Sequence, residues 1–237
     1  EKAGIIKPGV PLVCGCPPGG AAERVIAGRA RELAAPYFPV FARQARPEIL
    51  RHFPRATRAR YLSPEAEHRF VYTLGGDHQA SNAAVAIRTV EVLRDLGLDI
   101  PQAALERGLR RAFIPGRLER FPGKPSVILD GGHNLAGITV LTAALARKKV
   151  QGATLVFGVL ADKSYRRMIP LLRPFFARVI LTTPHCPRAL APARLVPLFS
   201  GVPSVEVVPD PAEALALAKK HGSLIIITGS LYLIGEM

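Results

Sequence analysis

From residue 117 onward, short apolar runs alternate along the chain with longer segments whose apolar residues recur at helical spacing. The runs predict strands at 126–130, 153–158, 178–183, 204–208 and 223–228, and the segments between them predict helices near 134–147, 163–175, 191–199 and 211–221. Parallel strands need such crossovers, and an uninterrupted run such as Leu224–Ile227 suits a strand covered on both faces. The pattern predicts an α/β, Rossmann-like doubly wound domain of mostly parallel strands. It lacks a Gly-x-Gly-x-x-Gly fingerprint, so NAD binding is not inferred.

The first half of the chain has a less regular pattern. It predicts short strands at 10–14 and 38–41, a helix at 21–35, a helix that opens at 75–82 and ends at Gly97, and a second helix from Ile100 to Ala112. The apolar stripe of the helix before Gly97 is expected to consist of Ala83, Ala86, Ile87, Val90 and Leu93. Residues 42–72 are rich in Arg and Pro and predict irregular strands and loops. Since Pro115-Gly116 breaks the helical pattern, we expect a domain boundary between residues 113 and 114.

Composition narrows the class of protein. The 237 residues are 49% hydrophobic and 21% charged, which allows a sizeable core. There is neither an apolar run long enough to cross a membrane nor a secretory signal pattern, and three cysteines are too few for a disulfide framework, so a cytoplasmic protein is expected. The first residue is Glu1, from which we expect a fragment or a truncated or split gene product.

The formal net charge of +14 is the strongest compositional signal. It is compatible with nucleic-acid binding, but the arginines are spread along the chain without a basic block or interleaved aromatic residues. One interpretation is arginine-rich helix surfaces without a ligand. The other is a field that attracts polyanions such as ATP or a polyglutamate tail.

The stretch from Asp130 to Asn134 (Asp-Gly-Gly-His-Asn) is expected to connect a buried strand to a helix. Ligands of open α/β sheets bind at that edge, and a helix N-terminus favours anions. Asp130 and His133 are therefore candidate ligand contacts, with Asn134 as the helix cap; a plain capped turn is the alternative. Gly229-Ser230 follows the last strand and is open to the same two interpretations.

Six motifs in order resemble folylpolyglutamate synthase and bifunctional dihydrofolate synthase, members of the Mur ligase superfamily. They are Glu1-Lys2-Ala3-Gly4-Ile5, His78-Gln79-x-x-Asn82-Ala83, Pro115-Gly116-Arg117-Leu118-Glu119, Leu129-Asp130-Gly131-x-His133-Asn134, Ala161-Asp162-Lys163 and the segment from Gly229 to Glu236. The resemblance implies an ATP-dependent ligase that adds L-glutamate to a folate or dihydropteroate carboxylate through an acyl phosphate. It implies ATP and Mg²⁺ as cofactors, small-molecule partners and a monomer; neither a membrane nor a nucleic acid is expected as a partner.

The resemblance also implies roles for individual residues. Lys2 matches a lysine that is carbamylated and helps organise the magnesium site, which makes it both a catalytic and a metal-site candidate; an ordinary solvated lysine is the alternative. The ATP-binding candidates are Asn82, Arg117 and Asp130, of which Asp130 is expected at the ribose. His133 is a catalytic candidate, and Asn134 and Ser230 are candidates on the glutamate side. Asp162 and Lys163 form either a domain-closing or glutamate-side pair, or a solvated helix start.

The chain also departs from the family pattern. Gly132 and Leu135 stand where the family usually has Ala and Pro, and losing a first-turn proline removes some preorganisation of the helix. No glycine-rich phosphate loop ending in Lys-Ser/Thr occurs in the 237 residues. The resemblance therefore implies that residues 1–113 are the trailing, incomplete part of a P-loop-type central ATPase domain, and that residues 114–237 are the carboxyl-terminal ligase domain. We expect the 237 residues alone to be inactive.

Two other functions stay open at this stage. The charge is compatible with a non-catalytic polyanion or nucleic-acid-binding α/β module, which a salt-dependent shift of DNA or RNA, unaffected by ATP, would favour. The other possibility is a split-gene remnant that works together with a partner chain carrying the phosphate loop. The DNA directly upstream would separate that case from an intact ligase.

Overall fold

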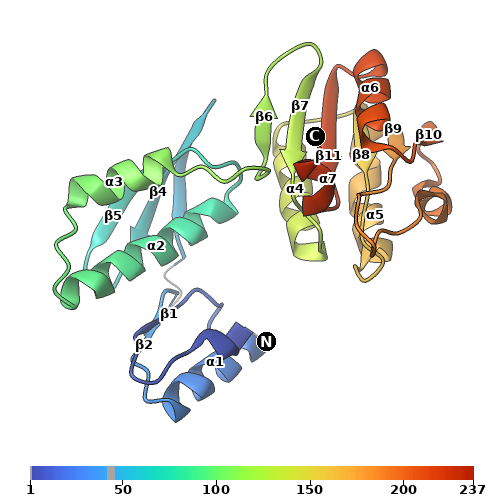
Figure 1. The fold of residues 1–237 in the computed structure, drawn as a ribbon. Coiled ribbons are helices and arrows are strands. Elements are labelled where there is room, and N and C mark those ends of the chain that lie inside the picture. The colour runs from blue at the N-terminus through green and yellow to red at the C-terminus, as the bar shows by residue number, and fades with distance from the viewer. Residues whose placement is uncertain (1, 42–45) are drawn as a thin grey trace. The chain divides into compact units, whose positions relative to one another are not determined.

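The structure is a computed structural model that describes residues 2–41 and 46–237. It divides the chain into two compact units, Glu1–Phe113 and Ile114–Met237, at the junction where the Pro-Gly break stands in the sequence. Each unit has its own core and is described by itself (Figure 1). In the described ranges, no helix is long and apolar enough to cross a membrane.

The second unit is built on a six-stranded sheet in the order β10-β9-β8-β11-β7-β6. Five strands are parallel, and β6 pairs antiparallel with β7 at one edge. The prediction of a mostly parallel sheet is confirmed, and each predicted strand lies within two residues of the observed one. The strands are β6 (Glu119–Phe121), β7 (Ser126–Asp130), β8 (Ala153–Phe157), β9 (Phe176–Leu181), β10 (Ser204–Val207) and β11 (Leu224–Thr228).

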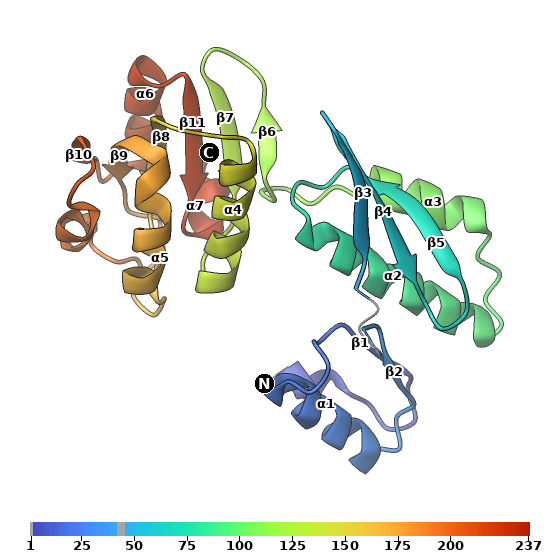
Figure 2. The same cartoon turned by 180° about the vertical axis from the view of Figure 1, so that it is seen from behind.

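Helices cover both faces of this sheet, as Figures 1 and 2 show. One face packs against α4 (Leu135–Arg147), α5 (Tyr165–Leu172) and the 3-10 helix η4 (Pro192–Phe199), around a core that includes Leu141, Met168 and Phe199. The other face packs against α6 (Pro211–His221) and α7 (Leu231–Gly235). The central strand β8 is buried along its whole length, which explains its uninterrupted apolar sequence.

Two predicted helices of this unit differ from the observed ones. The helix expected at 163–175 is α5 followed by the 3-10 helix η3 (Arg173–Phe175), and the segment expected as a helix at 191–199 is the 3-10 helix η4. Each of the two 3-10 segments contains a proline without a backbone N–H, Pro174 in η3 and Pro197 in η4.

The first unit begins with η1 (Lys2–Ile5), β1 (Leu12–Cys14), α1 (Ala21–Glu32) and β2 (Tyr37–Pro39). Strands β1 and β2 pair in parallel, as expected for two strands joined by a helix. The 3-10 helix η1 includes Gly4, and Glu1 lies outside the described residues. Helix α1 stops three residues before the predicted end, because Ala34 adopts a left-handed conformation with φ of 48°.

The two predicted helices that follow are α2 (His78–Asp95) and α3 (Gln102–Arg111). Gly97, with φ of 91°, ends α2 as predicted. The expected apolar stripe of α2 was wrong at Ala86, which is exposed. The buried face instead includes Gln79, Arg88 and Glu91. Arg88 donates to Glu91 and to Glu65, and Glu91 also lies within hydrogen-bond distance of His68 on β5.

The sequence predicts irregular strands and loops at 42–72, and the structure has three strands there that pair in one sheet. Residues 42–45 lie outside the described residues, but β3 (Glu48–Phe53), β4 (Ala56–Leu62) and β5 (Glu67–Tyr72) form an antiparallel sheet, in which the β3–β4 register shifts between Ile49 and Arg51. The inward positions are buried and packed by α2 and α3, namely Ala59, Tyr61, Phe70 and Tyr72. Arg58-Ala59-Arg60-Tyr61 alternates outward and inward positions, which is the period-2 signal of a half-buried strand that the sequence prediction did not use.

Candidate functional site

The loop from β7 to α4 lies at the carboxyl edge of the parallel sheet, where the sequence predicts a ligand site. Asn134 is the N-cap of α4, and its Oδ1 accepts a hydrogen bond from the backbone N–H of Gly137 at 2.8 Å. This confirms the predicted cap. It leaves the amide Nδ2 of Asn134 as the atom that could contact glutamate, a role that stays a prediction.

Asp130, the last residue of β7, is tied to two backbone amides. Its Oδ2 accepts from Leu118 N–H at 3.1 Å and its Oδ1 accepts from Gly132 N–H at 3.0 Å. The residue is only 7% exposed. Burial raises the pKa of Asp130 above its ordinary value, while the two amides and the positive charges of Arg117 and His133 pull it down less strongly.

These hydrogen bonds hold the segment that enters the second unit in an unusual backbone conformation. Gly116 has φ of 65° and Leu118, a residue with a β-carbon, has φ of 49°. Left-handed backbone costs about 1 kcal/mol or more for such a residue, and the bond from Leu118 N–H to Asp130 stabilises it. Gly131 N–H also donates to Gly116 O at 2.7 Å, so the segment that carries Arg117 is fixed to the end of β7 on both sides.

The carboxyl end of β11 closes the same loop from the other side. Gly229 N–H and Thr228 Oγ1 both donate to Gly132 O, at 3.1 and 3.2 Å. Gly229 has φ of 110°, and a β-carbon there would lie 2.5 Å from Gly158 O. Glycine is required at this position because both the conformation and the close approach exclude a side chain.

Ser230 caps α7, since its Oγ accepts from Tyr232 N–H at 3.1 Å. It is 1% exposed. The capped turn that the sequence left open is therefore the observed structure. A contact between Ser230 and substrate stays a prediction, and it would require the five-residue helix α7 to shift.

His133 is half-buried, and its Nδ1 lies 2.8 Å from Gly131 O. Because a carbonyl oxygen only accepts, Nδ1 carries the hydrogen, and Nε2 is the ring atom left for a ligand. In the neutral ring that atom accepts a hydrogen bond, and in the protonated ring it donates one. His133 can thus serve either an amino group or a phosphate oxygen at this edge.

A second polar group lies on the loops that follow β8 and β9. Asp162 Oδ2 is 2.9 Å from Lys163 Nζ and 3.5 Å from Arg188 Nη1, and Ala161 N–H donates to Arg188 O at 2.9 Å. Lys163 holds the pKa of Asp162 below its ordinary value. The predicted Asp162–Lys163 pair is present, but sequence reasoning missed Arg188, whose only signal is its place after a strand adjacent to β8.

The two site residues of the first unit are both exposed. Lys2 lies in η1, and Asn82 lies in the first turns of α2, where its Nδ2 donates to Gln79 Oε1 at 2.8 Å. The structure thus brings together Arg117, Asp130 and His133 within one unit. That Lys2 and Asn82 face the same nucleotide stays a prediction.

The described side chains do not by themselves make a magnesium site. Across residues 2–41 and 46–237, no group of three or more His, Cys, Asp or Glu side chains is placed to hold a metal ion. Mg²⁺ bound to a nucleotide uses phosphate oxygens and few protein ligands. The role of Lys2 as a carbamate beside that ion stays a prediction.

Comparison with known proteins identifies the second unit. Residues 116–231 match the family described as Mur ligase, glutamate ligase domain. The chain is 32% identical over 239 residues to folylpolyglutamate synthase from Lacticaseibacillus casei, which covers 98% of this chain and 54% of the relative. It is 31% identical over 249 residues to dihydrofolate synthase/folylpolyglutamate synthase from Bacillus subtilis, covering 100% of this chain and 56% of that protein.

Solved structures agree with the sequences. Folylpolyglutamate synthase from Mycobacterium tuberculosis complexed with ADP has a TM-score of 0.84 and 25% identity, over 99% of this chain and 56% of that chain. The enzyme from Thermotoga maritima has a TM-score of 0.77 and 30% identity, over 99% and 54% of the two chains. The chain spans about half the length of the relatives it matches. Residues 116–231 therefore belong to the family of the Mur ligase glutamate ligase domain, and the whole chain is similar to folylpolyglutamate and dihydrofolate synthases over about half of their length.

Proposed function

We propose that this chain is part of an ATP-dependent ligase that adds L-glutamate to the carboxylate of a folate or a dihydropteroate. The observation that carries the proposal is the homology to folylpolyglutamate synthases along 98% of the chain. The predicted motif at Asp130 also lies at the sheet edge where α/β proteins bind ligands. A cytoplasmic monomer with small-molecule substrates and no nucleic-acid partner is part of the same proposal.

The proposed reaction has two steps. The substrate carboxylate attacks the γ-phosphorus of ATP, which forms an acyl phosphate and releases ADP. The amino group of glutamate, after losing a proton, then attacks the acyl carbon, which forms the amide and releases inorganic phosphate. Both steps need positive groups around phosphate oxygens and two reactants held close together.

Within the second unit, Arg117 is the proposed phosphate ligand and Asp130 its positioning residue. The guanidinium is a permanent cation that binds phosphate oxygens in pairs. Asp130 fixes the backbone on either side of Arg117 through Leu118 N–H, with Gly131 N–H on Gly116 O as the second link. Each oxygen of Asp130 has a further lone pair, so the predicted contact with ribose hydroxyls is compatible with the geometry.

Four further residues have proposed roles. His133 Nε2 is proposed to contact the phosphate or the glutamate amino group, and Asn134 Nδ2 the glutamate carboxylates. In the first unit, Asn82 is proposed to contact ATP. Lys2 is proposed to be carbamylated and to support Mg²⁺. When bound, Mg²⁺ would neutralise phosphate charge.

A nuclear magnetic resonance titration of the 237-residue chain with AMPPCP, a non-hydrolysable ATP analogue, tests the proposed nucleotide site. We expect the largest shifts at the backbone amides of 116–118 and 131–134, and their reduction in Arg117→Ala. Arg120→Ala, which changes an exposed arginine three residues away, is the control that should leave the shifts unchanged. No shift at about 10 mM analogue, or shifts confined to other loops, would contradict the proposal.

Turnover by the chain alone is a separate prediction. Because its residues include no glycine-rich phosphate loop, we expect no glutamate-dependent ADP formation from Mg-ATP, glutamate and either folate or dihydropteroate. Turnover above the level without glutamate would show that this chain holds the triphosphate in another way.

A further inference from the structure

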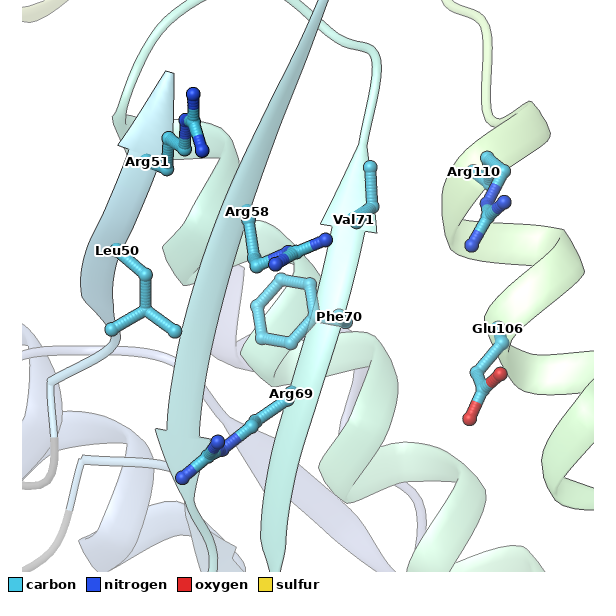
Figure 3. Close-up of a pocket in the computed structure, with 8 residues that line it drawn as sticks. All are labelled: Leu50, Arg51, Arg58, Arg69, Phe70, Val71, Glu106 and Arg110. Carbon is cyan, nitrogen blue, oxygen red and sulfur yellow. The ribbon is translucent and has the colours of Figure 1, made fainter. Parts of the chain in front are cut away.

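A groove lined by arginines lies between the three-stranded sheet and α3, within the first unit (Figure 3). Its volume is about 470 Å³, within the range of small-molecule sites. Figure 3 shows Arg110 and Glu106 projecting from α3 toward the arginines of the sheet. We call it the arginine groove; it is lined by Leu50, Arg51, Arg58, Arg69, Phe70, Val71, Glu106 and Arg110.

Two pairs of arginines stand directly opposite each other on the outward face of this sheet. Arg60 on β4 pairs in register with Arg69 on β5, and both reach carboxylates: Arg60 lies 2.5 Å from Glu48 and 3.7 Å from Glu67, and Arg69 lies 2.7 Å from Glu67. Like charges directly across two strands are destabilising. Intramolecular carboxylates neutralise this first pair.

The second pair, Arg51 on β3 and Arg58 on β4, has no such neutralisation. Within the described part of the chain, neither residue forms an ion pair, and neither does Arg110. The guanidinium carbons of Arg51 and Arg58 lie 5.1 and 5.7 Å from the centre of the Phe53 ring instead. Of the lining residues only Glu106 is acidic, so the groove concentrates unneutralised positive charge.

The composition of the groove favours carboxylates on an aliphatic chain over a nucleic acid. Adjacent strands are about 4.8 Å apart, so the unneutralised guanidinium groups of Arg51 on β3 and Arg58 on β4 offer neighbouring two-pronged sites for carboxylates, and Arg110 on α3 adds a third cation. Leu50 and Val71 offer apolar contacts to methylene groups between those sites. Base stacking needs an exposed aromatic face, but Phe70 is 4% exposed and Phe53 is already faced by two arginines.

We propose that the arginine groove binds a short chain of γ-linked glutamates. The choice of this polycarboxylate rests on the proposed ligase function, whose product would carry such a chain; the requirement for several carboxylates rests on the groove alone. Such a site would hold the growing tail of the product and raise the residence time of polyglutamylated substrate over that of the monoglutamate.

The test measures binding to the 237-residue chain by the fluorescence anisotropy of a labelled penta-γ-glutamate. We expect saturable binding that weakens as salt rises, with glutamate monomer competing at least about tenfold less well than unlabelled pentamer. The double variant R51Q/R58Q should lose at least about tenfold in affinity, because two charge-assisted contacts are removed.

The matched control is R31Q/R167Q, which removes the same charge from exposed arginines of α1 and α5 and should keep wild-type affinity. Circular dichroism is used to check that both variants are folded. Equal losses in the two double variants would show a non-specific charge effect and overturn the proposal. Tighter binding of a labelled single-stranded DNA 12-mer that R51Q/R58Q abolishes would overturn it in favour of a nucleic-acid surface.

This experiment requires no catalysis, so its outcome is independent of the ligase assay. If penta-γ-glutamate binds but AMPPCP causes no shifts at 116–118 and 131–134, the proposal for the groove stands and the proposal for the nucleotide site is contradicted. AMPPCP shifts without penta-γ-glutamate binding would retain the nucleotide site and overturn the groove.

Discussion

Each unit of the molecule contains a buried carboxylate, and the two are stabilised in opposite ways. In the second unit, Asp130 accepts hydrogen bonds from two backbone N–H groups, and burial raises the pKa of Asp130. Glu91 in the first unit accepts from the side chains of Ser63 at 2.5 Å, His68 at 2.7 Å and Arg88 at 2.9 Å. Burial raises the pKa of Glu91, but those three side chains outweigh it and leave the pKa below the ordinary value.

The difference shows what each carboxylate does. Backbone donors let Asp130 fix the path of loops, which leaves the side chains of Arg117 and His133 for a ligand. Side-chain donors let Glu91 tie α2 to the β4–β5 hairpin, and Arg88 extends the connection because its guanidinium lies 5.3 Å from the Phe38 ring of β2. The first is a device for shaping a site, and the second is a device for holding a small unit together.

The largest expected effect is that of Glu91→Gln. It leaves the buried guanidinium of Arg88 with only Glu65, at 3.2 Å, as a carboxylate partner. Breaking a buried ion pair costs about 3–5 kcal/mol, so the first unit should unfold at lower temperature while the second keeps its stability. Hydrogen exchange during thermal unfolding resolves the two units.

Glu65→Gln is the control for that variant, because Glu65 is 54% exposed and its loss should cost at most about 1 kcal/mol. Equal destabilisation by the two variants, or loss of protection in the second unit, would contradict the division of roles.

Asp130→Asn is expected to have the second largest effect. An amide keeps one acceptor but sets a donor against either Leu118 N–H or Gly132 N–H, which costs about 1–3 kcal/mol. Amide exchange should accelerate first at 116–118 and 132, and the AMPPCP-induced shifts should weaken. Asp210→Asn is the comparison, since Asp210 caps α6 through Glu213 N–H and should affect exchange only there. Unchanged protection at Leu118 would contradict the positioning role of Asp130.

Acid titration of unfolding should separate the two carboxylates by sign. The folded state holds the proton of Asp130 more tightly, so stability falls as pH rises from its ordinary value of 3.8 toward the raised pKa, and Asp130→Asn removes that fall. The folded state holds the proton of Glu91 less tightly. The contribution of Glu91 to the stability of the folded state is therefore complete above pH 4.5 and is lost as the pH falls through the lowered pKa.

Each of these two groups can contribute at most about 1.4 kcal/mol per pH unit. Urea unfolding of wild type, Asp130→Asn and Glu91→Gln at a series of acid pH values measures these slopes. Slopes of the same sign for the two residues would contradict the account.

The smallest effect is expected at the helix cap. Asn134→Ala should cost about 1 kcal/mol, and Asn134→Ser should restore most of it, because a serine hydroxyl also caps. If Asn134 Nδ2 also contacts glutamate, Asn134→Ser should still weaken glutamate-induced amide shifts in the loop. If Asn134→Ser restores both the stability and the glutamate-induced shifts, Asn134 serves only as a helix cap and its proposed contact with glutamate is contradicted.

The strands of the second unit could be predicted from sequence because their physics is local. A short apolar run rich in β-branched residues, such as Leu224–Ile227, favours a strand covered on both faces, and an Asn before a helical pattern, as at Asn134, favours a cap. The strands at 48–72 carry a local signal too, because outward arginines alternate with inward residues such as Ala59 and Phe70. Their pairing register could not be predicted, because it depends on tertiary contacts.

The hydrogen-bond network at Arg88 and Glu91 could not be predicted from the sequence, because its other members, Ser63 and His68, lie outside α2. Within the site, Asp130 was found as a strand-end acid, but the two backbone amides that hold it depend on the left-handed turn at Leu118. Such a turn is decided by tertiary contacts, and not by the residue that adopts it.

The most direct test of the central claim is a crystal structure of the chain grown with AMPPCP. We predict the Arg117 guanidinium on the phosphates, the Asp130 carboxylate still on Leu118 N–H, and Asn82 and Lys2 beside the same nucleotide. A nucleotide bound away from the loop 131–134, with Arg117 turned to solvent, would contradict the account.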